Sequence, residues 1–285
     1  MTRRLVSLMA GLALMAAPAS ADRPTLPADR PEIVAHRGAS ADAPENTMAS
    51  VKLGWEQQAD AVEVDVFLTA DNRVVCLHDK DLKRTTGDTR AIKDVAWADV
   101  AGLDAGSWKD PKWAGEPIPL LAPVMATVPD GKRLFVEIKC GPEIVPYLVE
   151  HVAAAGKKPE QIAFISFGAE VCAAVKKALP AHQVYYLSGF KTGDDGVVRP
   201  SFDELIAKAR ELGVDGLDVS YKGPLNADVV RRVHEAGLFL AVYTVDDPAV
   251  AADLAGMGVD SITTNKPGVM REHFEAAPRL PALAP

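Results

Sequence analysis

The chain has 285 residues, of which 48% are apolar, 25% are charged and 6% are aromatic. These ordinary values for a soluble globular protein exclude a disordered or collagen-like chain. With 31 Lys and Arg against 39 Asp and Glu, the formal charge is −8, which argues against broad nucleic-acid binding because that needs a basic surface. The length fits two domains or one α/β barrel of roughly 250 residues.

The first residues are typical of a cleaved secretory signal peptide. Arg3 and Arg4 precede an apolar run over residues 5–17, and small residues end at Ala21. This pattern predicts cleavage after Ala21, residues 22–31 as a linker, and a periplasmic or secreted protein. A retained anchor helix is the alternative, although the run is short for a membrane span. After cleavage we expect no stable membrane association, and the oligomeric state stays open.

Export would expose three cysteines to oxidation. The odd count leaves at least one of them unpaired unless chains are cross-linked. A bridge between Cys76 and Cys140 is compatible with the sequence, which cannot establish it. Cys172 is predicted to be a small core residue of a helix.

Short apolar runs alternate with amphipathic segments along the chain, which predicts parallel strands with helices outside them. The predicted strands cover residues 33–36, 61–68, 74–77, 134–138, 162–167, 184–187, 216–220, 238–245 and 261–263. The predicted helices cover residues 45–58, 143–155, 169–179, 202–212, 226–236 and 248–257.

Nine strands are one more than an eight-stranded barrel needs. Only five residues separate Leu68 from Val74, whereas a parallel crossover takes a dozen or more. Residues 74–77 are therefore predicted to return antiparallel, in a hairpin that turns at Asp71-Asn72. The other eight strands predict a TIM (β/α)₈ barrel over residues 32–275. Residues 80–122 read as a small insertion and residues 276–285 as a flexible tail.

Acidic side chains occur inside two predicted barrel strands. Glu63 and Asp65 alternate with valines, so both point to one face of a strand whose two faces are buried. Two buried carboxylates repel each other unless something compensates their charge. By the same alternation Glu137 shares a face with Lys139. The alternatives are surface acids on an edge strand for the first pair and an internal ion pair for the second.

Two histidines complete the predicted site. His36 stands at the carboxyl end of the first strand, where barrel enzymes place catalytic groups, and Arg37 beside it can bind an oxyanion. A two-residue hairpin loop would place His78 directly opposite Asp65, at the level of the acidic pair. A slip of one residue would turn His78 to the other face.

These groups together suit metal-assisted phosphodiester cleavage. Three carboxylates favour one hard divalent cation, Mg²⁺ or Ca²⁺. One histidine can accept a proton from the attacking hydroxyl or water, and the other can protonate the departing alkoxide. The cation, Arg37 and Lys139 would stabilise charge on the phosphate oxygens.

The ordered motifs resemble the glycerophosphodiester phosphodiesterase family from about Ile33 to Phe274. Each motif is weak alone, whereas the ordered set is highly specific. The matching pieces are His36-Arg37-Gly38, Glu45-Asn46-Thr47, Glu63-x-Asp65, His78-Asp79, Leu103-Asp104-Ala105-Gly106-Ser107-Trp108, Glu137-x-Lys139, Val242-Tyr243-Thr244-Val245 and Thr263-Thr264-Asn265-Lys266-Pro267.

The resemblance implies hydrolysis of small-molecule glycerophosphodiesters to sn-glycerol 3-phosphate and an alcohol. It implies Glu63, Asp65 and Glu137 as ligands of one divalent cation, Mg²⁺ or Ca²⁺. It also implies His36 and His78 as the acid–base pair, with His36 favoured as the base, and Arg37 and Lys139 as phosphate contacts.

Two positions depart from the family pattern. Tyr243 stands where the family often has Trp on the substrate-facing strand, and is predicted to bind substrate. Asn265 stands where Asp is common. Neither is expected to touch the catalytic set, so both bear on the identity of the alcohol.

Three other functions are less favoured. A related barrel phospholipase acting on lysophospholipids or phospholipids would need a membrane-docking surface, and no basic amphipathic patch is evident. A non-catalytic binding protein would not need the full acid, base and metal set. A zinc amidohydrolase would need a paired His-x-His, which His36-Arg37-Gly38 lacks.

Overall fold

The computed structural model describes residues 24–276. The predicted signal peptide, residues 1–21, and the predicted tail beyond residue 276 lie outside the described residues. No helix within residues 24–276 combines the length and apolar character needed to cross a membrane.

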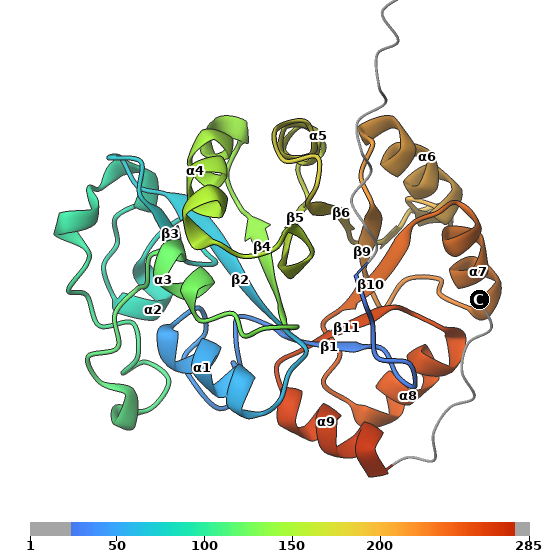
Figure 1. Ribbon diagram of the computed structural model, residues 1–285, viewed down its shortest axis with the longest axis horizontal. Coiled ribbons are helices and arrows are strands. Elements are labelled where there is room, and N and C mark those ends of the chain that lie inside the picture. Colours follow the sequence, from blue (N-terminus) through green and yellow to red (C-terminus); the bar gives the residue numbers. More distant parts are fainter. Residues whose placement is uncertain (1–23, 277–285) are drawn as a thin grey trace, which may run out of the picture.

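Eight parallel strands close into a barrel, as predicted (Figure 1). The pairing order is β1-β2-β4-β5-β6-β9-β10-β11, and the β1–β11 pairing completes the ring. The strands are β1 (Glu32–Ala35), β2 (Ala61–Leu68), β4 (Arg133–Ile138), β5 (Ile162–Ser166), β6 (Gln183–Ser188), β9 (Gly216–Ser220), β10 (Phe239–Tyr243) and β11 (Ser261–Thr264).

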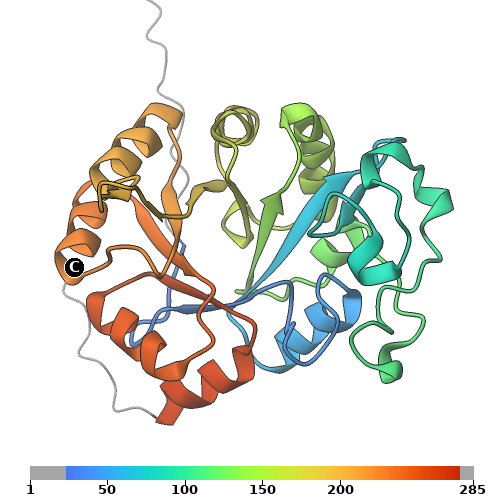
Figure 2. The same cartoon turned by 180° about the vertical axis from the view of Figure 1, so that it is seen from behind.

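Helices surround the strands on the outside (Figures 1 and 2). They are α1 (Met48–Glu56), α3 (Leu121–Ala126), α4 (Val145–Ala155), α5 (Ala169–Ala178), α6 (Phe202–Leu212), α7 (Ala227–Glu235), α8 (Pro248–Met257) and α9 (Pro267–Ala276). The first helix begins three residues later than predicted, because the Thr47 side chain accepts a hydrogen bond from the Ser50 amide and caps it. The sequence pattern had not indicated α3 and α9.

The hairpin after β2 forms as predicted, but its register differs by one residue. β3 (Val74–Cys76) pairs antiparallel with β2, and Leu68 lies opposite Val74. The loop holds three residues instead of two, because Asn72 takes a left-handed conformation (φ 63°) that closes a longer turn. Consequently Leu77, rather than His78, donates its amide to the Asp65 carbonyl. The predicted pairing of His78 with Asp65 is wrong.

Residues 80–120 form a small body beside the entrance of the barrel (Figure 1, left). It contains α2 (Lys83–Thr86) and three short 3-10 turns, Ile92–Asp94, Trp97–Asp99 and Pro111–Trp113. Its apolar side chains pack with Val75 and Leu77 of the preceding hairpin in a cluster separate from the barrel core. The cluster comprises Val75, Leu77, Leu82, Ile92, Val95, Val100, Ala105 and Ile118.

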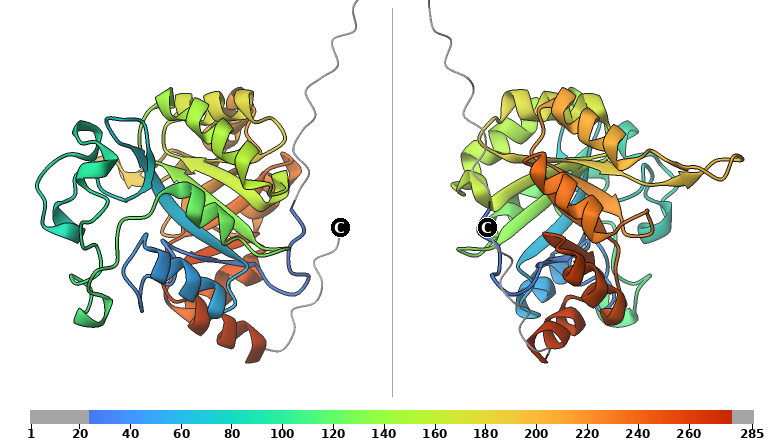
Figure 3. Two further views of the ribbon diagram at one scale, coloured as in Figure 1. Left: turned by 60° about the vertical axis from the view of Figure 1, so that its left-hand side comes forward. Right: turned by 90° about the vertical axis from the view of Figure 1, so that its right-hand side faces the viewer.

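A second extension follows β6 and projects from the molecule (Figure 3, right). It is a two-stranded hairpin of β7 (Lys191–Thr192) and β8 (Val198–Arg199), which the sequence pattern did not indicate. Phe190 packs its ring against Phe202 at the base of this hairpin, with 5.4 Å between ring centroids.

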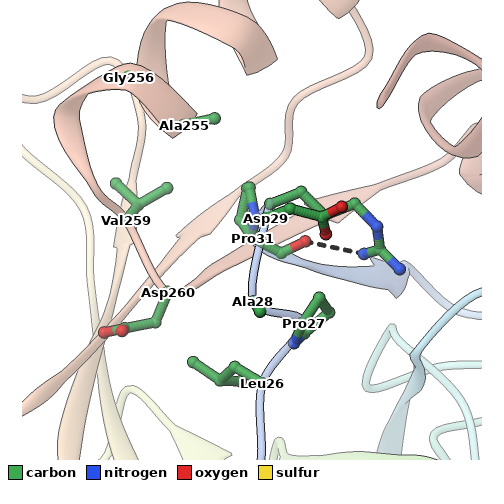
Figure 4. Close-up of a pocket in the computed structure, with 10 residues that line it drawn as sticks. Leu26, Pro27, Ala28, Asp29, Pro31, Ala255, Gly256, Val259 and Asp260 are labelled. Atoms are coloured by element: carbon green, nitrogen blue, oxygen red, sulfur yellow. Dashed lines mark hydrogen bonds between the residues drawn. The ribbon is translucent and has the colours of Figure 1, made fainter. Parts of the chain in front are cut away.

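The segment before β1 crosses the end of the barrel opposite the carboxyl ends of the strands, where Leu26 lies near Val259 and Asp260 (Figure 4). Asp60, just before β2, holds this segment. Its carboxylate accepts hydrogen bonds from Arg30 (2.5 Å) and from Arg271 of α9 (2.8 Å). Burial alone would raise the pKa of Asp60, but these partners lower it to about 2. One carboxylate thus joins the first and last parts of the described chain.

All three cysteines are free. Cys76 and Cys172 are buried, and Cys140 is half-buried. Burial raises the pKa of the Cys140 thiol to about 11, so this thiol is protonated at neutral pH. The bridge between Cys76 and Cys140 that the sequence left open is not formed.

A buried arginine fills the amino end of the barrel interior. The Arg133 guanidinium donates to both oxygens of Glu32 (2.8 and 3.1 Å) and to the Tyr185 hydroxyl (2.8 Å). It lies 4.7 Å from the ring centroid of Phe135 and 5.7 Å from that of Phe239. The charge is therefore paired and enclosed by aromatic rings.

Arg133→Met should lower the free energy of unfolding by about 3–5 kcal/mol, because it leaves the Glu32 carboxylate buried without its partner. Urea unfolding measures this loss. The double variant Arg133→Met/Glu32→Gln should recover a large part of it. A single variant as stable as the wild type would show that this pair does not support the barrel.

Candidate active site

Three carboxylates meet inside the barrel mouth. The alternation in β2 points Glu63 and Asp65 inward, and the β2–β4 register sets Asp65 beside Glu137. One oxygen from each residue lies within 4.8 Å of the other two. All three side chains are buried, and Asp65 is fully inaccessible. The structure thus brings the three predicted ligands together.

Electrostatics make this cluster unfavourable without a counter-ion. Burial, together with Asp65 and Glu137, raises the pKa of Glu63 well above its usual value. Burial and Asp65 raise the pKa of Glu137 to about 7, against the opposing charge of Lys139. One oxygen of Glu63, Oε1, and one of Asp65, Oδ1, are buried and accept no hydrogen bond within the described chain. Buried carboxylate oxygens that accept no hydrogen bond and lie so close together fit a hard divalent cation.

The two positively charged side chains of the predicted site, Lys139 and Arg37, lie against this cluster. Lys139 Nζ is 2.7 Å from Glu137 Oε1 and 3.5 Å from Asp65 Oδ1. Arg37 Nε is 3.1 Å from Asp65 Oδ2, and its Nη1 is 2.9 Å from Glu45 Oε1. Their placement beside the acids neutralises part of the negative charge of the cluster.

Asn46 fixes Asp65 from the loop before α1. Its Nδ2 donates to Asp65 Oδ2 (2.8 Å), and its Oδ1 accepts the Asp65 amide (3.0 Å). The predicted helix start would have made Glu45 a first-turn acid, whereas Glu45 lies in this loop and pairs with two arginines. The Glu45-Asn46 motif was the sequence signal for this arrangement.

His36 is half-buried and held by Asn265. Asn265 Nδ2 donates to Asp246 Oδ2 (2.7 Å), so its Oδ1 faces His36 Nδ1 at 2.7 Å and the Ser40 hydroxyl at 2.8 Å. Nδ1 of His36 must therefore carry the hydrogen, which leaves Nε2 as the acceptor. Burial and neighbouring Arg37 lower the pKa of His36 to about 4. The expectation that Asn265 does not touch the catalytic set is wrong.

Asn265→Leu should reduce kcat about ten- to hundredfold, because it leaves the Nδ1–H of the half-buried His36 without its acceptor, a cost of about 1–3 kcal/mol. Steady-state kinetics measure the effect, and KM should change little. Ser40→Ala is the control, because it removes a different hydrogen bond to the same Asn265 oxygen. Equal losses in both variants would contradict a specific role for the His36 contact.

His78 follows β3 by two residues and faces a small cavity that Glu45, Asn46 and Thr47 also line. Its Nδ1 lies 2.7 Å from Asp79 Oδ1, and its side chain is 30% exposed. Although the predicted strand register is wrong, His78 is connected to the acids by ion pairs. Asp79 binds Arg84, Arg84 binds Glu45, and Glu45 binds Arg37.

Tyr243 lines a second cavity with His36, Glu63 and Glu137. Its hydroxyl donates to the Ser188 carbonyl (3.0 Å), and its ring meets Phe167 edge-on at 6.2 Å. This cavity is continuous with the acidic cluster through shared residues. The position agrees with contact between Tyr243 and a ligand that reaches the three acids.

Asp218 is a fourth buried acid that the sequence analysis missed. It lies on β9, lines the same cavity as Tyr243, and its Oδ1 has no partner in the described chain. Burial and Glu137 raise the pKa of Asp218 well above its usual value. The signal was available, since an acid inside a predicted buried strand is the pattern that identified Glu63 and Asp65.

Comparisons with known proteins identify the family of this chain. The model of the glycerophosphoryl diester phosphodiesterase family matches residues 36–269. A glycerophosphodiester phosphodiesterase of Bacillus subtilis is 31% identical over 86% of each chain. One of Caldanaerobacter subterraneus is 32% identical over 82% of this chain and 94% of its own.

A solved structure supports the same assignment. An Oleispira antarctica phosphodiesterase, in complex with the product sn-glycerol-3-phosphate, superposes with a TM-score of 0.78 at 27% identity. The match covers 87% of this chain and 98% of that one. The chain therefore belongs to the glycerophosphoryl diester phosphodiesterase family and is, as its motifs implied, an enzyme of the phosphoric diester hydrolase class.

Proposed function

We propose that the protein hydrolyses glycerophosphodiesters to sn-glycerol 3-phosphate and an alcohol, with one divalent cation, Mg²⁺ or Ca²⁺, and two histidines. The observation that carries the proposal is the buried cluster of Glu63, Asp65 and Glu137, with two oxygens that accept no hydrogen bond, beside a neutral histidine. These carboxylates would hold the cation, which supplies charge neutralisation and polarises a phosphate oxygen.

Arg37 and Lys139 then bind the phosphate. Each already lies against the acids, so a bound phosphodiester between them is met by positive charge on both sides. Tyr243 and Asp218 line the neighbouring cavity, where one arm of the substrate enters.

Each histidine carries out one of the two proton transfers. His36 is neutral at pH 7, with Nε2 free to accept a proton from the attacking water or hydroxyl. The doubly protonated His78 ring, with its Nδ1 hydrogen on the Asp79 carboxylate, gives the proton on Nε2 to the departing alkoxide and is left neutral with its hydrogen at Nδ1. Base and acid thus come from separate loops at the barrel mouth.

A product assay with metal titration tests the proposal. The chelated protein should be inactive on glycerophosphocholine, glycerophosphoethanolamine and glycerophosphoglycerol, and Mg²⁺ or Ca²⁺ should restore release of sn-glycerol 3-phosphate. Lysophosphatidylcholine vesicles form a parallel arm. Turnover of the vesicles alone would favour the phospholipase alternative, and full activity after chelation would contradict the role of the cation.

We also propose that the protein is exported to the periplasm or secreted after cleavage behind Ala21. The basic, apolar and small-residue order of residues 3–21 supports this. Mass spectrometry of the protein from whole cells should find a new amino terminus at Asp22. An intact Met1 on a membrane-bound protein would contradict export by cleavage.

A further inference from the structure

We propose that Asp79 and Arg84 are positioning residues that hold His78 in the orientation of a general acid that donates from Nε2; this inference rests on the proposed function. The Asp79 carboxylate lies between His78 and Arg84. Its Oδ1 is 2.7 Å from His78 Nδ1, and its Oδ2 accepts a hydrogen bond from Arg84 Nε at 2.6 Å.

The contact selects one form of the imidazole. An ionised carboxylate only accepts hydrogen bonds, so the hydrogen on the His78 ring must be at Nδ1. Arg84 and His78 lower the pKa of Asp79 despite its partial burial, so this acceptor is ionised at neutral pH. A carboxylate in this place also stabilises the doubly protonated ring, which is the form that donates from Nε2.

Arg84 is itself held from two sides. Its Nη1 and Nη2 donate to the two oxygens of Glu45 at 2.8 and 2.7 Å, while Nε remains on Asp79. Serving two carboxylates at once uses the planar fork of a guanidinium, which a lysine cannot reproduce. The Trp108 ring, with its centroid 5.9 Å from the guanidinium carbon, flanks Arg84.

These contacts connect His78, the proposed general acid, to Arg37 at the proposed phosphate site. Glu45 Oε1 accepts from Arg84 Nη2 and also from Arg37 Nη1 at 2.9 Å. Arg84 comes from α2, in the insertion, whereas Arg37 and Glu45 come from the loop after β1. The insertion therefore supplies the residue that ties the hairpin carrying His78 to the barrel.

The test compares two leaving groups in the metal-loaded protein. Glycerophosphocholine releases an aliphatic alkoxide that needs a proton, whereas the p-nitrophenyl ester of glycerol 3-phosphate releases a stable phenolate that does not. In Asp79→Asn and Arg84→Gln, kcat on glycerophosphocholine should fall about ten- to hundredfold, and kcat on the nitrophenyl ester should stay within about threefold of the wild type. His78→Ala should show the same selectivity with a larger loss.

Two further variants separate positioning from structural support. Arg84→Lys keeps the charge and should lose nearly as much kcat on glycerophosphocholine as Arg84→Gln. Arg90→Gln removes another arginine ion pair of the insertion, with Asp88, and should leave both activities unchanged. Equal losses on both esters, or no loss on either, would overturn the positioning role. A wild-type protein inactive on both esters with Mg²⁺ and Ca²⁺ would instead refute the proposed function.

Discussion

Glu63→Gln should abolish cation binding and lower phosphodiesterase activity at least a thousandfold, without loss of folding. Glutamine has nearly the shape of glutamate without its charge, and burial beside Asp65 and Glu137 raises the pKa of Glu63, so a negative charge at this position is disfavoured without the cation. The cation-free variant should thus unfold at the same temperature as the wild type or above it, because one repulsive charge is gone.

Thermal unfolding with and without Mg²⁺ or Ca²⁺, together with calorimetric titration, measures both effects. The wild type should gain stability in proportion to the logarithm of the cation concentration, and the variant should not. Asp218→Asn is the matched control, since it neutralises another buried acid of the mouth outside the three-carboxylate group. Cation affinity in Glu63→Gln within a few-fold of wild type would rule out the proposed ligand set.

His36→Ala should reduce kcat about 10²–10⁴-fold, because it removes the ring nitrogen proposed to accept the proton. Cation binding should persist, because His36 lies outside the three-carboxylate group. In the cation-free wild type, the His36 ring should titrate near pH 4 in NMR spectra, which the lowered pKa requires.

The resonance of the His36 ring is assigned as the one that is missing from the spectrum of His36→Gln. His151→Ala is the activity control, since His151 lies on the outer helix α4 and its pKa is also lowered by burial. A His36→Ala variant with normal turnover would exclude this histidine as the base. A His36 ring that titrates near its ordinary value would contradict the half-buried arrangement in which the Asn265 amide holds the ring.

The sequence predicted most of the barrel because its signals are local. Val, Ile and Phe runs indicate strands, and period-two alternation assigns Glu63 and Asp65 to one face without knowledge of their neighbours. Placing Glu137 beside them needed only the order of parallel strands. The short spacing before Val74 likewise required an antiparallel return.

The failures concern conformations and contacts that no local pattern reports. The hairpin register depended on whether Asn72 would take a left-handed conformation, which asparagine tolerates but does not impose. The contact between Asn265 and His36 joins the last and first strands, 229 residues apart. Asp218 was missed because it has no partner acid in its own strand, although the alternation rule applied to it equally.

The insertion has its own apolar cluster, and this has a consequence for heat inactivation. Parts of a protein with separate cores can open at different free energies. The barrel core is far larger than that of the insertion, so moderate warming should loosen Arg84 and its partners while the barrel stays intact. Turnover of substrates with aliphatic leaving groups would then decline reversibly, at temperatures where circular dichroism still reports a folded enzyme.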